Sequence, residues 1–70
     1  MDIFKRRKIT EMVVSEMRWM YDHSELNIPQ WYVNLLISAE QRLILHDYDG
    51  AEHDVEQAIR GRCESMGVML

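Results

Sequence analysis

Four consecutive basic residues near the N-terminus are the most concentrated charge in the sequence: Lys5, Arg6, Arg7 and Lys8. Residues 1–8 carry four basic side chains and one acidic one, whereas residues 9–70 carry four basic and eleven acidic ones. A basic N-terminal arm of this kind can contact the phosphates of a nucleic acid. It can also be a solvated start of the chain, because no aromatic side chain is interleaved among its charges. We therefore expect weak, sequence-independent phosphate contacts at most.

A helix-turn-helix would need a recognition helix whose first turns face base edges and phosphates. The segment placed to serve as that helix begins with Glu52, Asp54 and Glu56. Three carboxylates there would repel the DNA backbone. A nucleic-acid function would therefore depend on the basic arm.

An acidic turn in the second half of the sequence matches part of a calcium-binding loop. Asp47, Asp49, Gly50 and Glu56 fall at positions 3, 5, 6 and 12 of an EF-hand. Position 1 would be Leu45, which has no oxygen to offer as a ligand. Two histidines in the same region lack the paired Cys or His spacing of a zinc site. We expect no metal ion and no other cofactor.

Catalytic motifs are missing from the sequence, so we expect no catalytic residues and no enzymatic activity. Cys63, the single cysteine, falls on the apolar face of a helical segment, which predicts a small buried thiol. It cannot form an internal disulfide, which favours a reducing compartment.

The basic arm is not followed by the uncharged run of a secretory signal, and no stretch is long and apolar enough to span a bilayer. These features predict a cytoplasmic protein that does not enter the membrane.

The elements that must position these residues follow from the helical spacing of the apolar side chains. One Pro and three Gly divide the chain into three such segments. We predict an all-α fold, with a single three-helix domain over residues 9–70. Its helices are expected at about 9–22, 29–46 and 50–66. Pro29 suits the first turn of the second helix, and Asp49 is expected to be the N-cap of the third.

Three charged residues fall inside apolar arcs of these segments: Glu16, Glu40 and Arg62. Buried charges are rare unless they are paired. Each side chain could lie at the edge of the bundle with its charged head in water. Alternatively, Arg62 pairs with Glu16 or Glu40, within the bundle or across a dimer interface, and fixes the register of the helices.

The apolar residues exceed what three short helices can hide from one another. They make up 47% of the sequence, and the helix at 29–46 is apolar on most of its faces. A chain of 70 residues has a small core, and a second subunit is one way to stabilise it. We therefore expect a homo-oligomer, most simply a homodimer, to complete the domain.

Six Met and two Trp indicate an adaptable surface for a protein partner, although Met can simply fill a core. The residues expected to bind that partner are Trp19, Trp31, Met12 and Met20. With a net charge of −4, the chain is expected to be a small acidic regulator or adaptor that acts by protein–protein binding. The alternative is a nucleic-acid-associated regulator that uses the basic arm.

Overall fold

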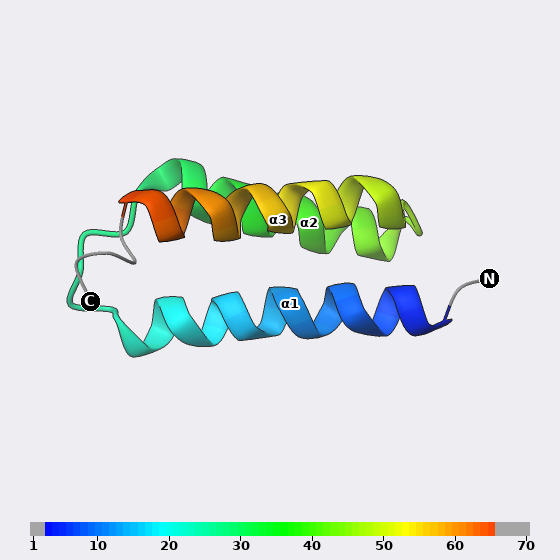
Figure 1. The fold of residues 1–70 in the computed structure, drawn as a ribbon, viewed down its shortest axis with the longest axis horizontal. Helices are drawn as coiled ribbons and strands as arrows, with labels where there is room; N and C mark the ends of the chain where they lie inside the picture. The colour runs from blue at the N-terminus through cyan, green and yellow to red at the C-terminus, as the bar shows by residue number, and fades with distance from the viewer. Residues whose placement is uncertain (1–2, 66–70) are drawn as a thin grey trace.

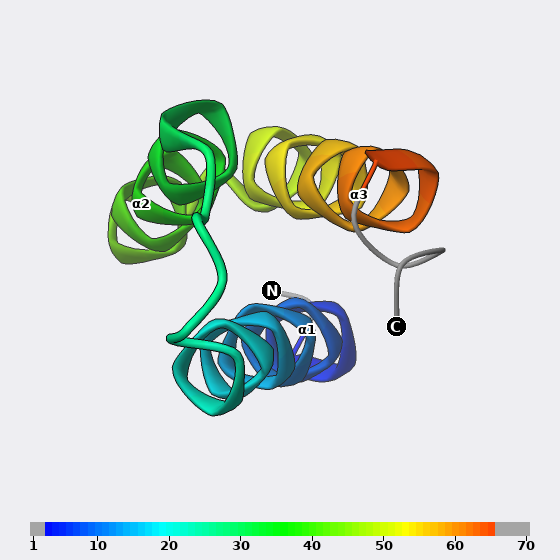
Figure 2. The ribbon, with the colours of Figure 1, turned by 90° about the vertical axis from the view of Figure 1, so that its left-hand side faces the viewer.

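Residues 3–65 are described by a computed structural model, and they form three helices without a strand. The helices are α1 (Ile3–Asp22), α2 (Gln30–Ile44) and α3 (Tyr48–Ser65). Seen end-on, they stand at the corners of a triangle, and α1 runs along the pair formed by α2 and α3 (Figures 1 and 2). The predicted all-α, three-helix architecture is confirmed.

The core lies where the three helices face one another, and α2 packs most closely against α3. Three of its eight buried hydrophobic residues are alanines, which allow close approach of the helix backbones. Such a core buries few large side chains, so much of the apolar surface of the chain lies outside it. The eight residues are Ile9, Val13, Tyr32, Leu36, Ala39, Ala51, Val55 and Ala58.

The first helix begins at Ile3, six residues earlier than the sequence pattern predicts. The basic arm expected over residues 1–8 is, from Ile3 onward, part of α1. Lys5 pairs with Asp49 at the start of α3, and the Lys8 Nζ lies 3.6 Å from a Glu52 carboxylate oxygen. Because these partners lie more than forty positions away in the sequence, periodicity within the segment does not reveal them. They hold the first turns of α1 against the start of α3.

A short turn joins α2 to α3 and satisfies the last carbonyls of α2. The His46 N–H donates to the Leu43 carbonyl (3.1 Å), and the Asp47 N–H donates to the Arg42 carbonyl (2.8 Å). This is a Schellman motif, which requires a residue in the left-handed region after the helix. His46 occupies that position with φ of 62°.

The cap of α3 is Asp47 rather than the expected Asp49. An Asp47 carboxylate oxygen accepts a hydrogen bond from the Gly50 N–H at 3.1 Å. Asp49 lies inside the helix instead, and its carboxylate accepts a hydrogen bond from Lys5. The bond to Lys5 holds the pKa of Asp49 below its usual range. The charge of Asp49 thus joins α1 to α3.

The left-handed backbone at His46 leads to a first prediction. Gly adopts this conformation without the penalty that a Cβ causes, so we expect His46→Gly to be more stable than His46→Ala by about 1 kcal/mol. Both variants lose the stacking of the His46 ring on Tyr48, so their difference isolates the backbone effect. Urea unfolding followed by circular dichroism measures it. Equal stabilities of the two variants would show that the turn is not strained.

Candidate functional site

A buried carboxylate at Glu16 is the centre of a polar cluster inside the bundle. The Arg62 Nε donates to one Glu16 oxygen at 2.6 Å, and the Arg62 Nη2 donates to the other at 3.2 Å. The Tyr32 hydroxyl donates to the first oxygen at 2.8 Å. Glu16 is 5% exposed and Tyr32 is fully buried. The three side chains come from α1, α2 and α3, so this cluster joins all the helices.

Aromatic rings enclose the guanidinium side of this cluster. Arg62 lies over the Trp19 ring, with its central carbon 5.0 Å from the ring centroid. Trp19 stacks on His23 at 4.5 Å and meets Tyr32 edge-on at 5.9 Å. Removing water from around a charge-assisted, two-pronged pair strengthens the attraction between its partners. The aromatic rings therefore reinforce the pairing of Arg62 with Glu16.

The protonation of the donors fits a structural role for the cluster. Burial, followed by the hydrogen bond to Glu16, raises the pKa of Tyr32 well above its ordinary value. The hydrogen bond to Glu16 is also the main cause that raises the pKa of Arg62. Both groups keep their protons at neutral pH and donate them to the same carboxylate. Glu16 is thus fully engaged, and the arrangement presents neither a free base nor an activated nucleophile.

The two charged residues predicted as alternatives for Arg62 have different surroundings. Glu16 makes the pair, whereas Glu40 is exposed on the surface of α2. Both occupy apolar arcs of their helices, so the sequence pattern alone leaves the choice open. What separates them is their level along the bundle, because Glu16 lies at the same end as Arg62.

A second polar cluster, which sequence reasoning missed, centres on Asp54 of α3. Asp54 is 7% exposed. One of its oxygens accepts a hydrogen bond from the Ser38 hydroxyl at 2.6 Å and lies 3.3 Å from the Arg42 Nε. In the sequence, Asp54 reads as one of several acids that suit the start of a helix. Its position beside Val55 and between two core alanines is the signal that could have identified it.

The residues predicted to bind a partner do not form one exposed patch. Met12, Trp19 and Met20 are half-buried and pack against the core. Trp31 is 42% exposed, but its ring lies over Gly61 of α3. A Cβ added at Gly61 would come within 2.5 Å of that ring. Three of these side chains thus pack against the core, and the fourth, Trp31, packs on α3 while it remains partly exposed.

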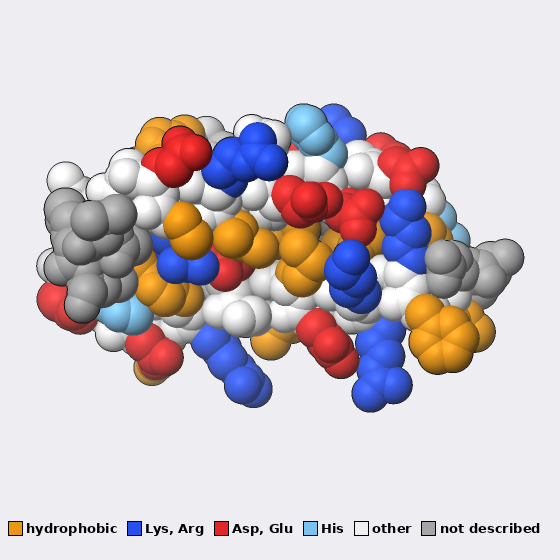
Figure 3. Space-filling model, viewed as in Figure 1, with side chains coloured by type: hydrophobic (Ala, Val, Ile, Leu, Met, Phe, Trp, Pro, Cys, Tyr) orange, Lys and Arg blue, Asp and Glu red, His pale blue; other side chains and the backbone are white. Residues whose placement is uncertain are grey.

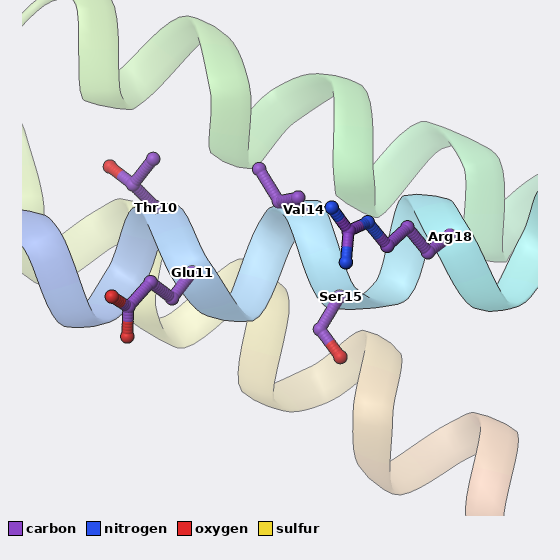
Figure 4. Close-up of a pocket in the computed structure, with 5 residues that line it drawn as sticks. All are labelled: Thr10, Glu11, Val14, Ser15 and Arg18. Atoms are coloured by element: carbon purple, nitrogen blue, oxygen red, sulfur yellow. The ribbon is translucent and has the colours of Figure 1, made fainter.

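Apolar residues other than the four predicted to bind a partner are exposed along the side of the molecule formed by α1 and α2. On α1, Val14 is 43% exposed and Tyr21 is 82% exposed; on α2, Ile37 is 48% and Ile44 is 70% exposed. Figure 4 shows Thr10 and Val14 on the side of α1 nearest α2, and Ser15 on the other side. We call this surface the α1/α2 face. Its members are Ile3, Arg6, Thr10, Val14, Met17 and Tyr21 on α1, and Val33, Ile37, Glu40 and Ile44 on α2.

The face formed by α1 and α3 is different in character. In Figure 3, hydrophobic side chains lie in a row between these two helices, and charged side chains border the row. The ion pairs of Lys5, Lys8 and Arg62 all join α1 to α3. Ion pairs therefore link α1 to α3, whereas no ion pair described in residues 3–65 joins α1 to α2.

The basic residues predicted to contact phosphate are divided between two roles. Lys5 and Lys8 pair with acids of α3. Arg6 and Arg7 are exposed, and the Arg7 Nε lies 3.3 Å from a carboxylate oxygen of Glu11. The four residues thus do not extend together into solvent.

Three smaller observations concern ligands and chemistry. Cys63 is exposed rather than buried as predicted, because it lies at the edge of the apolar arc of α3 and not over the core. An open depression of about 360 Å³ lies on α1 alone, lined by Thr10, Glu11, Val14, Ser15 and Arg18 (Figure 4). Within residues 3–65, no three His, Cys, Asp or Glu side chains gather as a metal site.

None of the helices described is long and apolar enough to cross a membrane.

Comparison of the chain with protein-family models, with curated proteins and with solved structures finds no match. Function must therefore be argued from the geometry of the chain itself.

The Glu16 cluster leads to a second prediction. Arg62→Met should destabilise the protein by about 3 kcal/mol, because it leaves a buried carboxylate without its cation. The double variant Glu16→Leu with Arg62→Met should recover most of this loss, since no charge is then buried and the Tyr32 hydroxyl keeps the Glu16 backbone carbonyl as an acceptor at 3.2 Å. Urea unfolding of the three proteins measures the difference. A single variant as stable as the double one would contradict the argument.

A third prediction follows from the raised pKa of Tyr32. The unfolded chain releases this proton near pH 10, whereas the folded protein retains it to higher pH. Its contribution to stability is therefore complete below pH 10 and is lost as the pH rises beyond that value. Each pH unit in that range should cost about 1.4 kcal/mol. The decline should be shallower in Tyr32→Phe, as measured by urea unfolding between neutral and alkaline pH, and equal slopes would refute it.

Proposed function

We propose that this chain is a small non-enzymatic binding module, a regulator or adaptor, whose α1/α2 face receives a protein partner. The observation that supports this proposal is the exposure of five large apolar side chains on that face: Ile3, Val14 and Tyr21 on α1, and Ile37 and Ile44 on α2. Isolated apolar residues are ordinary on protein surfaces, but several large ones on the same side of two neighbouring helices favour an interaction surface.

The composition of the α1/α2 face favours a protein over other ligands. Its aliphatic residues offer dispersion contacts and burial, and its few polar groups are interspersed rather than gathered into a pocket. The centre of the face, at Val14 and Ile37, is apolar, which is the usual arrangement of an interface core. A protein surface with matching apolar side chains is the partner that such a face fits.

The competing proposal, nucleic-acid binding through the basic residues, has less support. Lys5 and Lys8 would have to leave their acidic partners on α3 before they could contact phosphates. Each phosphate contact would then replace an existing ion pair. Arg6 and Arg7 remain accessible, which allows weak contacts that decline with salt.

Crosslinking in cells that produce the protein tests the proposed function. A photoactivated crosslinking residue is placed at Ile37, in the centre of the α1/α2 face, and in a matched variant at Glu56, on the exposed surface of α3. We expect protein adducts from position 37 and few from position 56. Adding Val14→Asp to the first variant should remove the adducts, because a charge without a partner at the centre of an interface opposes binding.

Two results would overturn the proposal. Equal yields of protein adducts from both positions would show that the α1/α2 face has no special role. Nuclease-sensitive adducts from a crosslinking residue at Arg6, in the absence of protein adducts from position 37, would favour the nucleic-acid function instead.

A further inference from the structure

We propose that the α1/α2 face binds a second copy of this chain, with α1 of each copy against α2 of the other and with Arg6 of each copy paired to Glu40 of its partner. This inference rests on the proposed function and names the partner.

The residues of the α1/α2 face follow, on both helices, the spacing of a helix–helix seam. On α2, Val33, Ile37, Glu40 and Ile44 are separated by four, three and four residues. Such alternation keeps side chains on one line of a helix that packs against another helix. On α1, Thr10, Val14, Met17 and Tyr21 repeat the same four-three-four spacing. On both helices most of the seam is exposed in the single chain, whereas Val33 and Met17 are half-buried and Met17 packs against the core.

The dimensions of the face match a partner of two helices. The molecule extends 39 × 18 × 18 Å, so the outline of one whole long side is about 700 Å², which is of the same order as the roughly 800 Å² of accessible surface that each partner contributes to a standard interface. A single foreign helix would cover one groove and leave part of the face exposed. The α1/α2 face of another copy has the required width and the same pattern, which makes the surface self-complementary.

The contact between Tyr32 and Glu16 sets the levels of the side chains along the face. α1 and α2 run in opposite directions (Figure 1). Starting from the level of Tyr32 and Glu16, each residue toward the C-terminus of α2 therefore corresponds to one residue toward the N-terminus of α1. Glu40 then lies level with residue 8 of α1, and Arg6 lies two residues, or about 3 Å, further along. Arg6 belongs to the face because it is four residues before Thr10, on the same side of the helix.

Two symmetric arrangements bring two such faces together, and the charges favour one of them. With the two-fold axis parallel to the helices, α1 faces the α2 of the partner at unchanged levels, so Arg6 meets Glu40. With the axis across the helices, α1 faces α1 and α2 faces α2, so Glu40 of one copy does not lie opposite Arg6 of the other and has no basic partner in the seam of the facing helix. A charge buried against an apolar side chain is costly, whereas a charge with its counterpart is not. The first arrangement is therefore the one we propose.

The mass of the protein in solution is the first test. Sedimentation equilibrium at tens of micromolar should give a dimer, twice 8.4 kDa. Ile37→Asp should be monomeric under the same conditions, while Arg60→Asp, on the exposed surface of α3, should remain dimeric. Circular dichroism confirms that each variant is folded. A monomeric wild-type protein, or dissociation by Arg60→Asp and not by Ile37→Asp, would overturn the proposal.

Charge reversal tests the pairing itself. Arg6→Glu and Glu40→Arg should each weaken dimerisation at least about tenfold, because each homodimer then contains two contacts between like charges. A mixture of the two single variants should dimerise again, since both contacts of the mixed dimer join opposite charges. A pair within one chain would not give this recovery. Failure of the mixture to dimerise, or single variants that dimerise like the wild type, would refute the proposed arrangement.

The outcomes separate this inference from the proposed function. A monomeric chain that crosslinks from position 37 to a different protein contradicts the second copy and leaves the binding function intact. A chain that dimerises but gives no adducts of any kind from position 37 contradicts both, because the dimer must then use another surface. Adducts of twice the chain mass from position 37, together with recovery in the mixture, support both.

Discussion

The buried carboxylate of Glu16 is the constraint on which the arrangement of the three helices depends. A carboxylate in this position must be compensated, and its two partners, Arg62 and Tyr32, come from the other two helices. These two contacts fix the position of α1 along the bundle axis relative to both neighbouring helices. With that register, Lys5 and Lys8 reach the first turns of α3, and the apolar seams of α1 and α2 lie side by side and open to solvent. A polar interaction thus determines where the apolar surface is placed.

Much of the architecture follows from the sequence because it depends on contacts within each segment. Helical spacing locates three helices, and the break around Pro29 separates the first two. The early start of α1 and the cap at Asp47 are different, since the former depends on ion pairs with a distant helix and the latter on the path of one turn. Local patterns also identify Glu16 and Arg62 as charges on apolar arcs. They do not identify them as partners, because level along the bundle is a property of the assembled helices.

The distribution of large apolar residues shows the same limit. Periodicity indicates the direction in which a side chain leaves its helix, but not what lies in that direction. Trp19 and Met12 therefore resemble binding residues in the sequence, while in the structure they lie between helices. Ile37 and Ile44 only widen the apolar arc of the central helix in the sequence, yet they are largely exposed, because α1 covers one side of that arc and nothing within residues 3–65 covers the rest. The excess of apolar residues is predictable, whereas its location is not.

The ion pairs between α1 and α3 also favour the observed handedness of the bundle. A hairpin of two helices offers two opposite grooves to a third, and apolar packing alone distinguishes poorly between them. If α1 occupied the other groove, the side that carries Lys5, Lys8 and Glu16 would turn toward α2. Lys5 and Lys8 would lose their acidic partners on α3, and Glu16 would be separated from Arg62. The mirror-related topology would thus bury a lone carboxylate, and the sequence excludes it by charge rather than by shape.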